Sequence, residues 1–297
     1  LHNRDLLDYY KTDLSAYCKH YMEIGKAEGR TCLPTGDEQG LIGTYSTHYD
    51  TTVPRAVNIG IAVERLNGTV IQPGQLFSYS QTLLPRIPEN GYVMAPAIGR
   101  YEYGGGICQV STTLYNAVLR AELNVTERSP HSMTVHYVDL SEDAAIAGTY
   151  KDFKFVNSTE YPIYIEGYTT SDKKITFNIY GKETRDKNRT ISFESQMVSE
   201  TPATTILQED AGQGIGYKAV SSKGSSGYVA ELYKIVKVNG VETDRIKVNK
   251  STYKGTNRVV TYGTAGDPTL SENLRAAIAA QDEALADANI AAAVPAQ

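Results

Sequence analysis

Apolar residues recur at helical or strand spacing through the first 180 residues, and this pattern predicts one mixed domain. Helical spacing from Ala56 to Leu66 predicts a helix, with Pro54 in its first turn and Asn67-Gly68 at its end. A second helix is predicted over 107–122. Strand-like runs surround the helices at 42–49, in two parts of 68–77, and at 131–138, 153–157, 163–168 and 175–180. The pattern predicts an α+β fold that is mostly β, with one central helix packed on a sheet.

The pattern changes on either side of this domain. A charged stretch at 182–190 is followed by short strand-like runs separated by glycine and serine, which predict a small elongated β-rich module. An alanine-rich acidic tail follows, with a helix over 274–293 that we expect to fray because it has few large apolar residues. We therefore predict an N-terminal helical linker segment, a mixed domain, a linker, a β module and a tail, at 1–40, 41–181, 182–190, 191–263 and 264–297.

Composition and charge narrow the class of protein. The chain has 22 tyrosines, 5 phenylalanines and no tryptophan, which together with its many β-branched residues favours strands. A net charge of -5 argues against a nucleic-acid partner, which needs a basic face. The sequence has no apolar run of about 18 residues, so we expect membrane attachment only through a segment outside this chain, which begins with Leu1.

Three cysteines raise the question of which thiol is reactive. In an oxidising compartment Cys18 and Cys32 form the natural pair, closing a loop of about 15 residues that contributes roughly 3 kcal/mol. Cys108 is then the odd thiol, either reactive or filling the core as a small apolar residue. The alternative that all three are reduced stays open.

Cys108 follows three glycines and lies at the start of the predicted 107–122 helix. The N-terminus of a helix favours an anion such as a thiolate. Cys108 also lies on a different stripe of this helix from Ile107, Val110 and Leu114, so it does not share the main apolar face. We predict that Cys108 is a nucleophile facing a cleft.

A cysteine nucleophile needs an imidazole within hydrogen-bond reach, and two histidines follow the helix. On the predicted strand 131–138, His131 shares its face with the apolar Met133 and Val135, whereas His136 lies on the opposite face. We predict that His131 is the partner of Cys108.

Two other features of the sequence indicate a function less clearly. His48 and Asp50 share a strand face and, with a downstream histidine, could hold zinc, but no metal-binding motif accompanies them, so we expect neither metal nor cofactor. The stretch from Lys218 to Arg258 contains nine basic residues and only three acidic ones. This stretch is either a solvated sheet face or a contact for an anionic polymer.

One string, Gly104-Gly-Gly-Ile-Cys-Gln-Val-Ser-Thr-Thr-Leu-Tyr-Asn116, is specific enough to indicate a family. Together with Arg55-Ala-Val-Asn-Ile59, Glu127-Arg128 and His131-Ser132, it makes the segment 45–181 resemble the VanW family of bacterial cell-envelope proteins. Residues 191–263, with Tyr-Lys-Ile-Val-Lys-Val-Asn-Gly at 233–240, resemble the G-five module, an extracellular β-rich domain of cell-wall proteins.

The resemblance implies L,D-transpeptidation, in which Cys108 attacks a peptidoglycan stem peptide and His131 relays the proton. Asp143 is implied as the residue that orients His131, although the sequence reads Val-Asp-Leu-Ser-Glu-Asp-Ala-Ala at 138–145 where the family has Val-Pro-Leu-Gly-x-Asp-Ala-Thr. Backbone N–H groups from 106 to 109 would form the oxyanion hole. The implied substrate contacts are Gly105, Gly106, Gln109, Ser111, Thr112 and Arg128.

We therefore expect an extracellular protein of a bacterial cell envelope that forms peptide cross-links through a Cys108 thioester, or acts as a carboxypeptidase if water is the acceptor. The expected partners are stem peptides and anionic wall polymers. One alternative is a non-catalytic peptidoglycan-binding or glycopeptide-resistance accessory protein. The other is a zinc-dependent amidase that uses His48 and Asp50.

Overall fold

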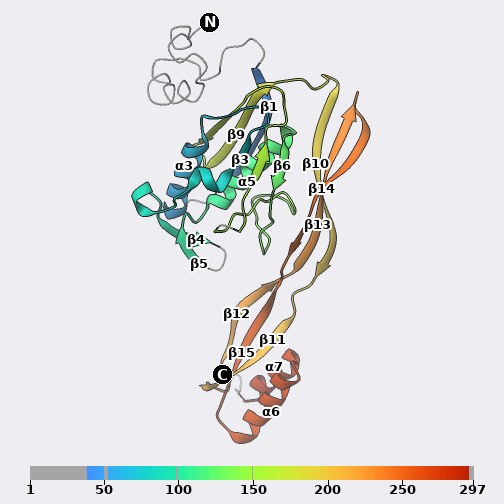
Figure 1. The fold of residues 1–297 in the computed structure, drawn as a ribbon. Helices are drawn as coiled ribbons and strands as arrows, with labels where there is room; N and C mark the ends of the chain where they lie inside the picture. The colour runs from blue at the N-terminus through green and yellow to red at the C-terminus, as the bar shows by residue number, and fades with distance from the viewer. Residues whose placement is uncertain (1–38, 50–52, 98–99, 149, 294–297) are drawn as a thin grey trace. The chain divides into compact units, whose positions relative to one another are not determined.

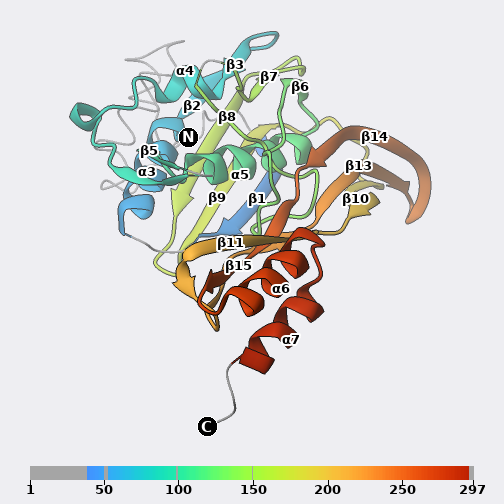
Figure 2. The ribbon, with the colours of Figure 1, turned by 90° about the horizontal axis from the view of Figure 1, so that it is seen from below.

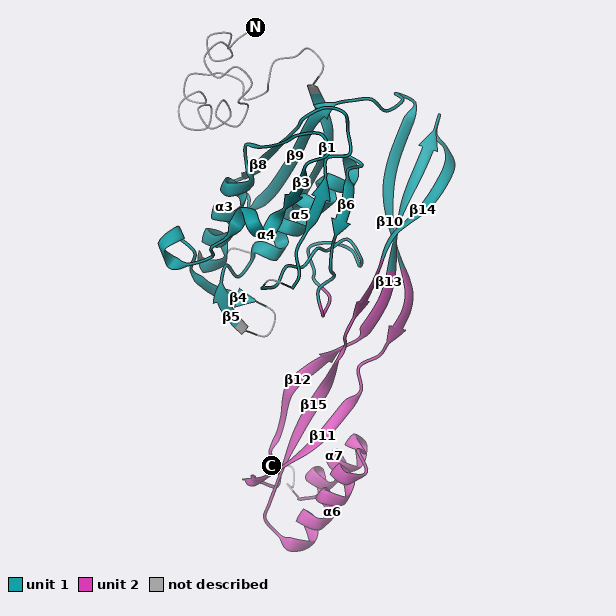
Figure 3. Cartoon of the chain, in the orientation of Figure 1, with its two compact units in different colours: residues 1–131, 135–196, 231–249 teal, residues 132–134, 197–230, 250–297 magenta. Residues whose placement is uncertain are grey.

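The computed structural model describes residues 39–49, 53–97, 100–148 and 150–293. The chain folds into two compact units (Figure 3). The first comprises residues up to 131, 135–196 and 231–249, and the second comprises 132–134, 197–230 and 250–297. Residues 1–38 of the predicted N-terminal linker segment, and with them the predicted Cys18–Cys32 pair, lie outside the described residues. The last two residues of that segment, Gln39 and Gly40, instead begin the strand Gln39–His48.

A four-stranded antiparallel sheet with two helices forms the framework of the first unit (Figure 1). Its strands follow the order β1-β9-β8-β2, with bounds Gln39–His48, Lys174–Lys182, Ile163–Thr169 and Thr69–Ile71. Helix α5 (Ile107–Arg120) packs on β1 and β9, and α3 (Val53–Leu66) packs on β8 and against α5. The prediction of a mostly β, α+β fold with a central helix on a sheet is confirmed.

Helix α5 is buried along nearly its whole length, on both sides. On one side it crosses β1 at Gly43, where an added Cβ would lie 2.5 Å from the Ala117 carbonyl oxygen. On the other side the ring of Tyr115 meets that of Phe153 edge-on, with the ring centroids 5.5 Å apart. Phe153 leads into a second sheet, of order β3-β7-β6, whose strands are Leu76–Ser78, Lys154–Val156 and Asn124–Glu127.

The segment between β3 and α5 has more structure than its prolines suggested. It contains the short helix α4 (Tyr79–Leu83), the 3-10 turn η2 (Pro88–Asn90) and the hairpin of β4 (Met94–Ala97) with β5 (Arg100–Tyr103). Pro96 is compatible with β4 because a two-stranded hairpin leaves each strand with a free edge, where a missing N–H costs little.

The predicted strand at 131–138 is wrong, because these residues form an irregular loop. The backbone N–H of His131 donates to the Asp143 carboxylate rather than to a neighbouring strand. Met133, predicted to point inward, is exposed. The loop is therefore held by a side-chain contact, which strand periodicity cannot reveal.

Residues 189–265 form two three-stranded sheets. One has the order β10-β13-β14, with bounds Arg189–Thr201, Gly227–Val238 and Val241–Tyr253. The other has the order β11-β15-β12, with bounds Thr205–Gly214, Thr256–Ala265 and Lys218–Ser225. Strand β15 pairs parallel with β11 and antiparallel with β12. The β-rich module predicted for this region is thus present.

Two helices replace the single frayed helix predicted over 274–293. Helix α6 (Pro268–Ala279) begins at an Asp267 cap and packs on β11 and β15, and α7 (Glu283–Ala293) packs on α6 (Figure 2). Leu274 and Ile278 join Leu207, Val260 and Tyr262 in a small core. The prediction of fraying was wrong because this core supplies the tertiary packing that an isolated alanine-rich helix lacks.

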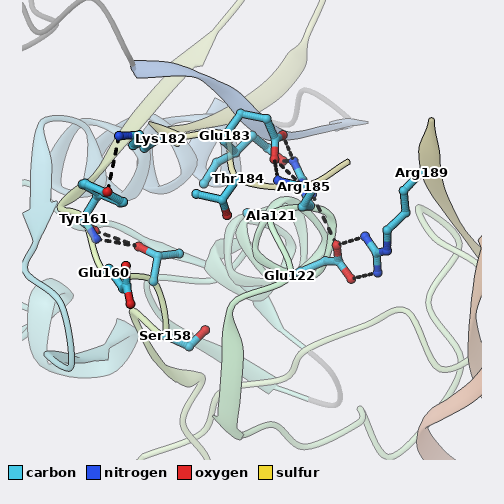
Figure 4. Close-up of a pocket in the computed structure, with 12 residues that line it drawn as sticks. Ala121, Glu122, Ser158, Glu160, Tyr161, Lys182, Glu183, Thr184, Arg185 and Arg189 are labelled. Atoms are coloured by element: carbon cyan, nitrogen blue, oxygen red, sulfur yellow. Dashed lines mark hydrogen bonds and ion pairs between the residues drawn. The ribbon is translucent and has the colours of Figure 1, made fainter. Parts of the chain in front are cut away.

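Glu122, just beyond the end of α5, binds two cations of the β10-β13-β14 sheet. Its carboxylate accepts hydrogen bonds from both terminal nitrogens of Arg189 and from Nζ of Lys234, the latter at 2.9 Å. Figure 4 shows the pair with Arg189 at the rim of a hollow of about 470 Å³. Burial raises the pKa of Glu122, but the hydrogen bonds from Arg189 and Lys234 outweigh it and lower the pKa to about 2.

Replacing Glu122 by glutamine should make the stability of the first unit less dependent on pH. The folded pKa of about 2 lies below the unfolded value, so the ion pairs stabilise the fold above about pH 4.3 and are lost as the pH falls through about 2. In urea unfolding at neutral pH, Glu122→Gln should lower the free energy of unfolding by about 1–3 kcal/mol. The difference from the unsubstituted protein should vanish near pH 2.

The matched control is Glu160→Gln, an exposed glutamate lining the same hollow. It should change the free energy of unfolding by less than about 0.5 kcal/mol. An equal effect of the two substitutions at neutral pH would show that the contacts of Glu122 contribute nothing.

Candidate active site

Glycines shape the turn that leads into α5. Gly106 is the N-cap residue, with φ 107°, a left-handed conformation that side chains disfavour. A Cβ on Gly105 would lie 2.4 Å from the Ala95 carbonyl oxygen, so only glycine allows β4 to approach the turn. Cys108, the second residue of α5, is half-buried with a free thiol, whereas Ile107 and Gln109 beside it are buried. The turn therefore leaves the thiol accessible at the start of an otherwise buried helix.

The structure brings Cys108, His131 and Asp143 together. The Nδ1 of His131 lies 2.6 Å from Oδ2 of Asp143, and the same oxygen accepts the backbone N–H of His131 at 2.6 Å. Cys108 lies near enough to His131 to raise the pKa of the imidazole. Because Asp143 occupies Nδ1, Nε2 is the ring nitrogen left for a contact with the thiol. This is the arrangement of a nucleophile, a base and an orienting carboxylate.

The charges around His131 favour its protonated form. Burial lowers the pKa of His131, but the hydrogen bonds to Asp143 and Cys108, with the negative charges of both groups, raise it to about 9. The imidazole is therefore protonated at neutral pH when Cys108 is a thiolate. As a neutral thiol, Cys108 can instead donate to the Ile146 carbonyl oxygen, 3.4 Å from its sulfur.

Asp143 is itself held by a buried set of polar side chains. Arg128 donates from Nη2 to Oδ1 of Asp143 at 3.0 Å and from Nε to the Asp143 carbonyl oxygen at 2.6 Å. On α5, Ser111 donates to the carbonyl oxygen of Ala144, and Thr112 accepts the N–H of Ala144 at 3.0 Å. Three of the predicted substrate contacts, Ser111, Thr112 and Arg128, thus lie inside the protein and fix the segment that carries Asp143.

The departure from the family pattern at 138–145 has a structural counterpart. Ser141, where the family has glycine, adopts a left-handed conformation with φ 68°. Its carbonyl oxygen accepts hydrogen bonds from Nη2 of Arg128 at 3.1 Å and Nδ2 of Asn249 at 3.1 Å. The turn keeps the conformation that glycine would favour, because the surrounding hydrogen bonds hold it.

Gln109, another predicted substrate contact, connects α5 to the end of β1. Its Nε2 donates to the His48 carbonyl oxygen at 2.7 Å and to Oγ1 of Thr47 at 3.2 Å. Its Oε1 accepts from Nη2 of Arg55 at 3.3 Å. The side chain is buried, so these contacts leave little of it exposed at the surface of the site.

Two tyrosines that sequence reasoning missed lie around the thiol. The hydroxyl of Tyr79 donates to the Ile107 carbonyl oxygen at 2.8 Å, and Tyr137 lies near enough to Thr112 and Cys108 for both to affect the pKa of its phenol. Burial raises the pKa of both phenols, and the negative charge of Cys108 raises it further. The sequence carries no signal for them, because tyrosine occurs 22 times along the chain.

The two other histidines that the structure describes have no comparable surroundings. His136 is exposed and stacks edge-on against the Tyr137 ring, and His48 is exposed at the end of β1. Within the described ranges, no three His, Cys, Asp or Glu side chains are grouped so that they could hold a metal. Asp50 lies outside those ranges, so the zinc hypothesis stays untested.

The hollow in Figure 4 lies at the opposite end of α5 from Cys108, and neither cysteine nor histidine lines it. Its charged side chains contact other residues of the hollow: Arg185 donates to Glu183, and Nζ of Lys182 lies over the Tyr161 ring. The thiol and imidazole of the candidate site therefore lie away from this hollow, at and beside the first turn of α5.

The basic stretch 218–258 is largely neutralised by acidic residues. At least five of its nine basic side chains form ion pairs: Lys218 with Glu283 and Asp287, Lys234 with Glu122, Arg245 with Glu194, Lys247 with Glu231, and Arg258 with Glu283. Four of the acidic partners, Glu122, Glu194, Glu283 and Asp287, come from outside the stretch. Among the helices that the structure describes, none has the length and apolar character needed to span a membrane.

Comparisons with known proteins identify two domains. The family described as "VanW like protein" matches residues 54–180, and the family described as "G5 domain" matches residues 194–265. The uncharacterized protein YoaR of Bacillus subtilis is 37% identical over 129 residues, which cover 42% of this chain and 43% of YoaR. The vancomycin B-type resistance protein VanW of Enterococcus faecalis is 28% identical over 137 residues, which cover 42% of this chain and 49% of that protein.

The chain thus spans less than half the length of these curated relatives. Among solved structures, an IgA1 protease G5 domain is 24% identical, with 28% of this chain and 100% of that chain covered and a TM-score of 0.21. The predicted resemblance to a VanW domain followed by a G-five module is confirmed by the two family matches.

Removing the Asp143 carboxylate should lower the pKa of His131. The pKa of about 9 depends on the hydrogen bond to Asp143, which stabilises the imidazolium against burial. In an NMR titration of the His131 ring, Asp143→Asn should lower the midpoint by at least about one pH unit. Glu142→Gln is the control, because the neighbouring carboxylate Glu142 bonds to Tyr45 instead. An unchanged midpoint in Asp143→Asn would contradict the triad geometry.

Proposed function

We propose that this chain, which carries a VanW-like domain followed by a G5 domain, is a cysteine acyl-transferase that acts on peptidoglycan stem peptides. The observation that carries the proposal is the contact of Cys108 with a buried His131 that is itself held by Asp143. A cysteine acyl-transferase uses a thiol beside an imidazole, and a third group such as Asp143 orients the imidazole.

In the first half of the proposed reaction, the Cys108 thiolate attacks the carbonyl carbon before the terminal residue of a stem peptide. The N–H groups of Ile107 and Gln109 donate to the carbonyl oxygens of Gly104 and Gly106. The backbone N–H of Cys108 is therefore the first-turn donor that we propose to stabilise the negative charge on the carbonyl oxygen. His131 donates its proton to the departing amine, the C–N bond breaks, and the acyl group remains on sulfur as a thioester.

In the second half, an amine from another stem attacks the thioester, and His131 takes up its proton. The product is a peptide cross-link, as in L,D-transpeptidation, and the thiolate is restored. When water replaces the amine, the same steps release a shortened stem peptide, which is the carboxypeptidase reaction. Both outcomes use the same three side chains, so the acceptor decides between them.

We propose positioning roles for the residues around this triad. Asp143 keeps Nε2 of His131 directed at the sulfur, and Arg128, Ser111 and Thr112 hold the Asp143 segment through the hydrogen bonds described above. Gln109 fixes the first turn of α5 to β1. Gly105 and Gly106 give the turn its close approach and its left-handed conformation.

The proposed location is the cell surface of a bacterium, with peptidoglycan as the partner. The G5 match supports a surface protein, and one relative is a vancomycin B-type resistance protein, which suggests a cell-wall context. That relative also keeps open a second role, in which the chain supports glycopeptide resistance by binding peptidoglycan without catalysis.

Acyl-enzyme formation separates the proposal from its alternatives. Incubation with a tetrapeptide-bearing peptidoglycan fragment should give a thioester adduct by mass spectrometry and a cross-linked dimer by chromatography. Cys108→Ala should abolish both, and His131→Ala should slow adduct formation by at least about 100-fold, since it removes proton transfer. His136→Ala is the control and should stay within about two-fold, because that side chain is exposed and lies outside the triad.

Three results would contradict the proposal. Peptidoglycan binding that survives in Cys108→Ser, with no adduct in the unsubstituted protein, would support the non-catalytic role. Equal losses from His131→Ala and His136→Ala would remove His131 as the specific partner of Cys108. Activity that chelators abolish and zinc restores would support the zinc-dependent amidase.

A further inference from the structure

Two arginines lie across the glycine turn that leads to Cys108. Arg55 belongs to α3, and a Cβ on Gly106 would lie 2.5 Å from Cγ of Arg55. Arg86 lies between α4 and η2, and a Cβ on Gly104 would lie 3.2 Å from Cδ of Arg86. The aliphatic parts of both side chains therefore pack against glycines of the turn. A larger residue in place of either glycine would displace the arginine beside it.

Each of these arginines has a buried N–H group without a protein partner. Within the described part of the chain, four buried side-chain nitrogen or oxygen atoms lack a hydrogen bond, and two of them are Nε of Arg55 and Nη1 of Arg86. A buried donor left unpaired destabilises the fold, and more so when it is charged. Two such guanidinium donors beside one turn indicate a place that an anionic ligand would complete.

The two guanidinium groups belong to the same site as the thiol. The charges of Cys108 and Arg55 both affect the pKa of the Tyr137 phenol, and those of Cys108 and Arg86 both affect the pKa of the Tyr79 phenol. The terminal Nη2 of Arg55 donates to the neutral amide of Gln109. Among the described residues, no carboxylate forms an ion pair with Arg55 or Arg86, so their positive charges remain available to a ligand.

We infer that Arg55 and Arg86 bind the free α-carboxylate of the terminal residue of the stem peptide, the residue that leaves as an amino acid. This inference rests on the proposed acyl transfer. When Cys108 attacks the carbonyl before the last residue, that residue's carboxylate lies within about 4 Å of the scissile bond, a single residue's reach. Guanidinium groups match a carboxylate in charge and in hydrogen-bond geometry.

The assignment explains why the enzyme would act on the last peptide bond of a stem rather than on an internal one. An internal residue presents a neutral amide where the terminal residue presents a carboxylate, and the amide leaves both arginines unpaired. During the step the C–N bond breaks, the C–S bond forms, His131 protonates the departing amine, and the carboxylate stays bound to the arginines until the amino acid leaves.

The test compares two tetrapeptide stems of the same sequence, one ending in the free acid and one in the carboxamide. With the full chain, the rate of thioester formation by mass spectrometry should be at least about 100-fold higher for the acid, because the amide leaves a binding site for charge unfilled. Arg55→Gln and Arg86→Gln should each lower the rate for the acid by at least about 10-fold and leave the rate for the amide unchanged.

The control is Arg65→Gln, in the same helix as Arg55, which removes a guanidinium that lies over the Tyr92 ring. It should leave the preference for the acid unchanged. Arg55→Lys and Arg86→Lys keep the positive charge and should retain part of the preference, which separates recognition from a failure to fold.

The outcomes distinguish this inference from the proposed function. Equal rates for acid and amide in the unsubstituted protein would overturn the carboxylate site and leave the acyl transfer intact. Equal losses on both substrates in the glutamine variants would show that the arginines act on the thiol or on folding, which would also overturn it. No adduct with either substrate would contradict the proposed function itself.

Discussion

Burial of α5 on both of its sides is the constraint on which the site depends. A buried helix must satisfy every polar side chain it carries, because an unpaired polar group in the interior costs more than a hydrogen bond contributes. Ser111, Thr112 and Asn116 meet this requirement by bonding to the backbone at 142–144. The hydrogen bonds that make the helix compatible with the core therefore also place Asp143, and through it His131.

The same burial explains why the sequence predicted the helices and strands of the first unit but not several of the side-chain contacts between them. Periodicity located α3, α5 and strands β1, β8 and β9, since each repeats apolar residues at its own spacing. It failed at 131–138, where a carboxylate rather than a strand partner holds the backbone. Of the three histidines that the structure describes, His131 is nevertheless the buried one, as expected, but the cause is its contact with Asp143 and not the alternation of a strand.

The roles of individual site residues are the part that the sequence could not supply. Serine, threonine, glutamine and arginine near a reactive thiol are the residue types that bind substrates, and they are also the types that satisfy a buried backbone. Only the positions of their partners separate the two: Gln109 meets β1, and Arg128 meets Asp143. Arg55 and Arg86 drew no attention as a pair in the sequence, because 31 residues separate them and the fold brings both to one turn.

Glu122 connects the C-terminal end of α5 mechanically to two neighbouring strands. One end of the helix carries the thiol, and just beyond its other end a single carboxylate binds Arg189 of β10 and Lys234 of β13. A helix of 14 residues is a stiff rod about 21 Å long, so a force applied to those strands is transmitted along its axis rather than absorbed by bending. Within the first unit, the parts of β10 and β13 that carry Arg189 and Lys234 therefore cannot shift along α5 without breaking these ion pairs or straining the helix that positions Cys108.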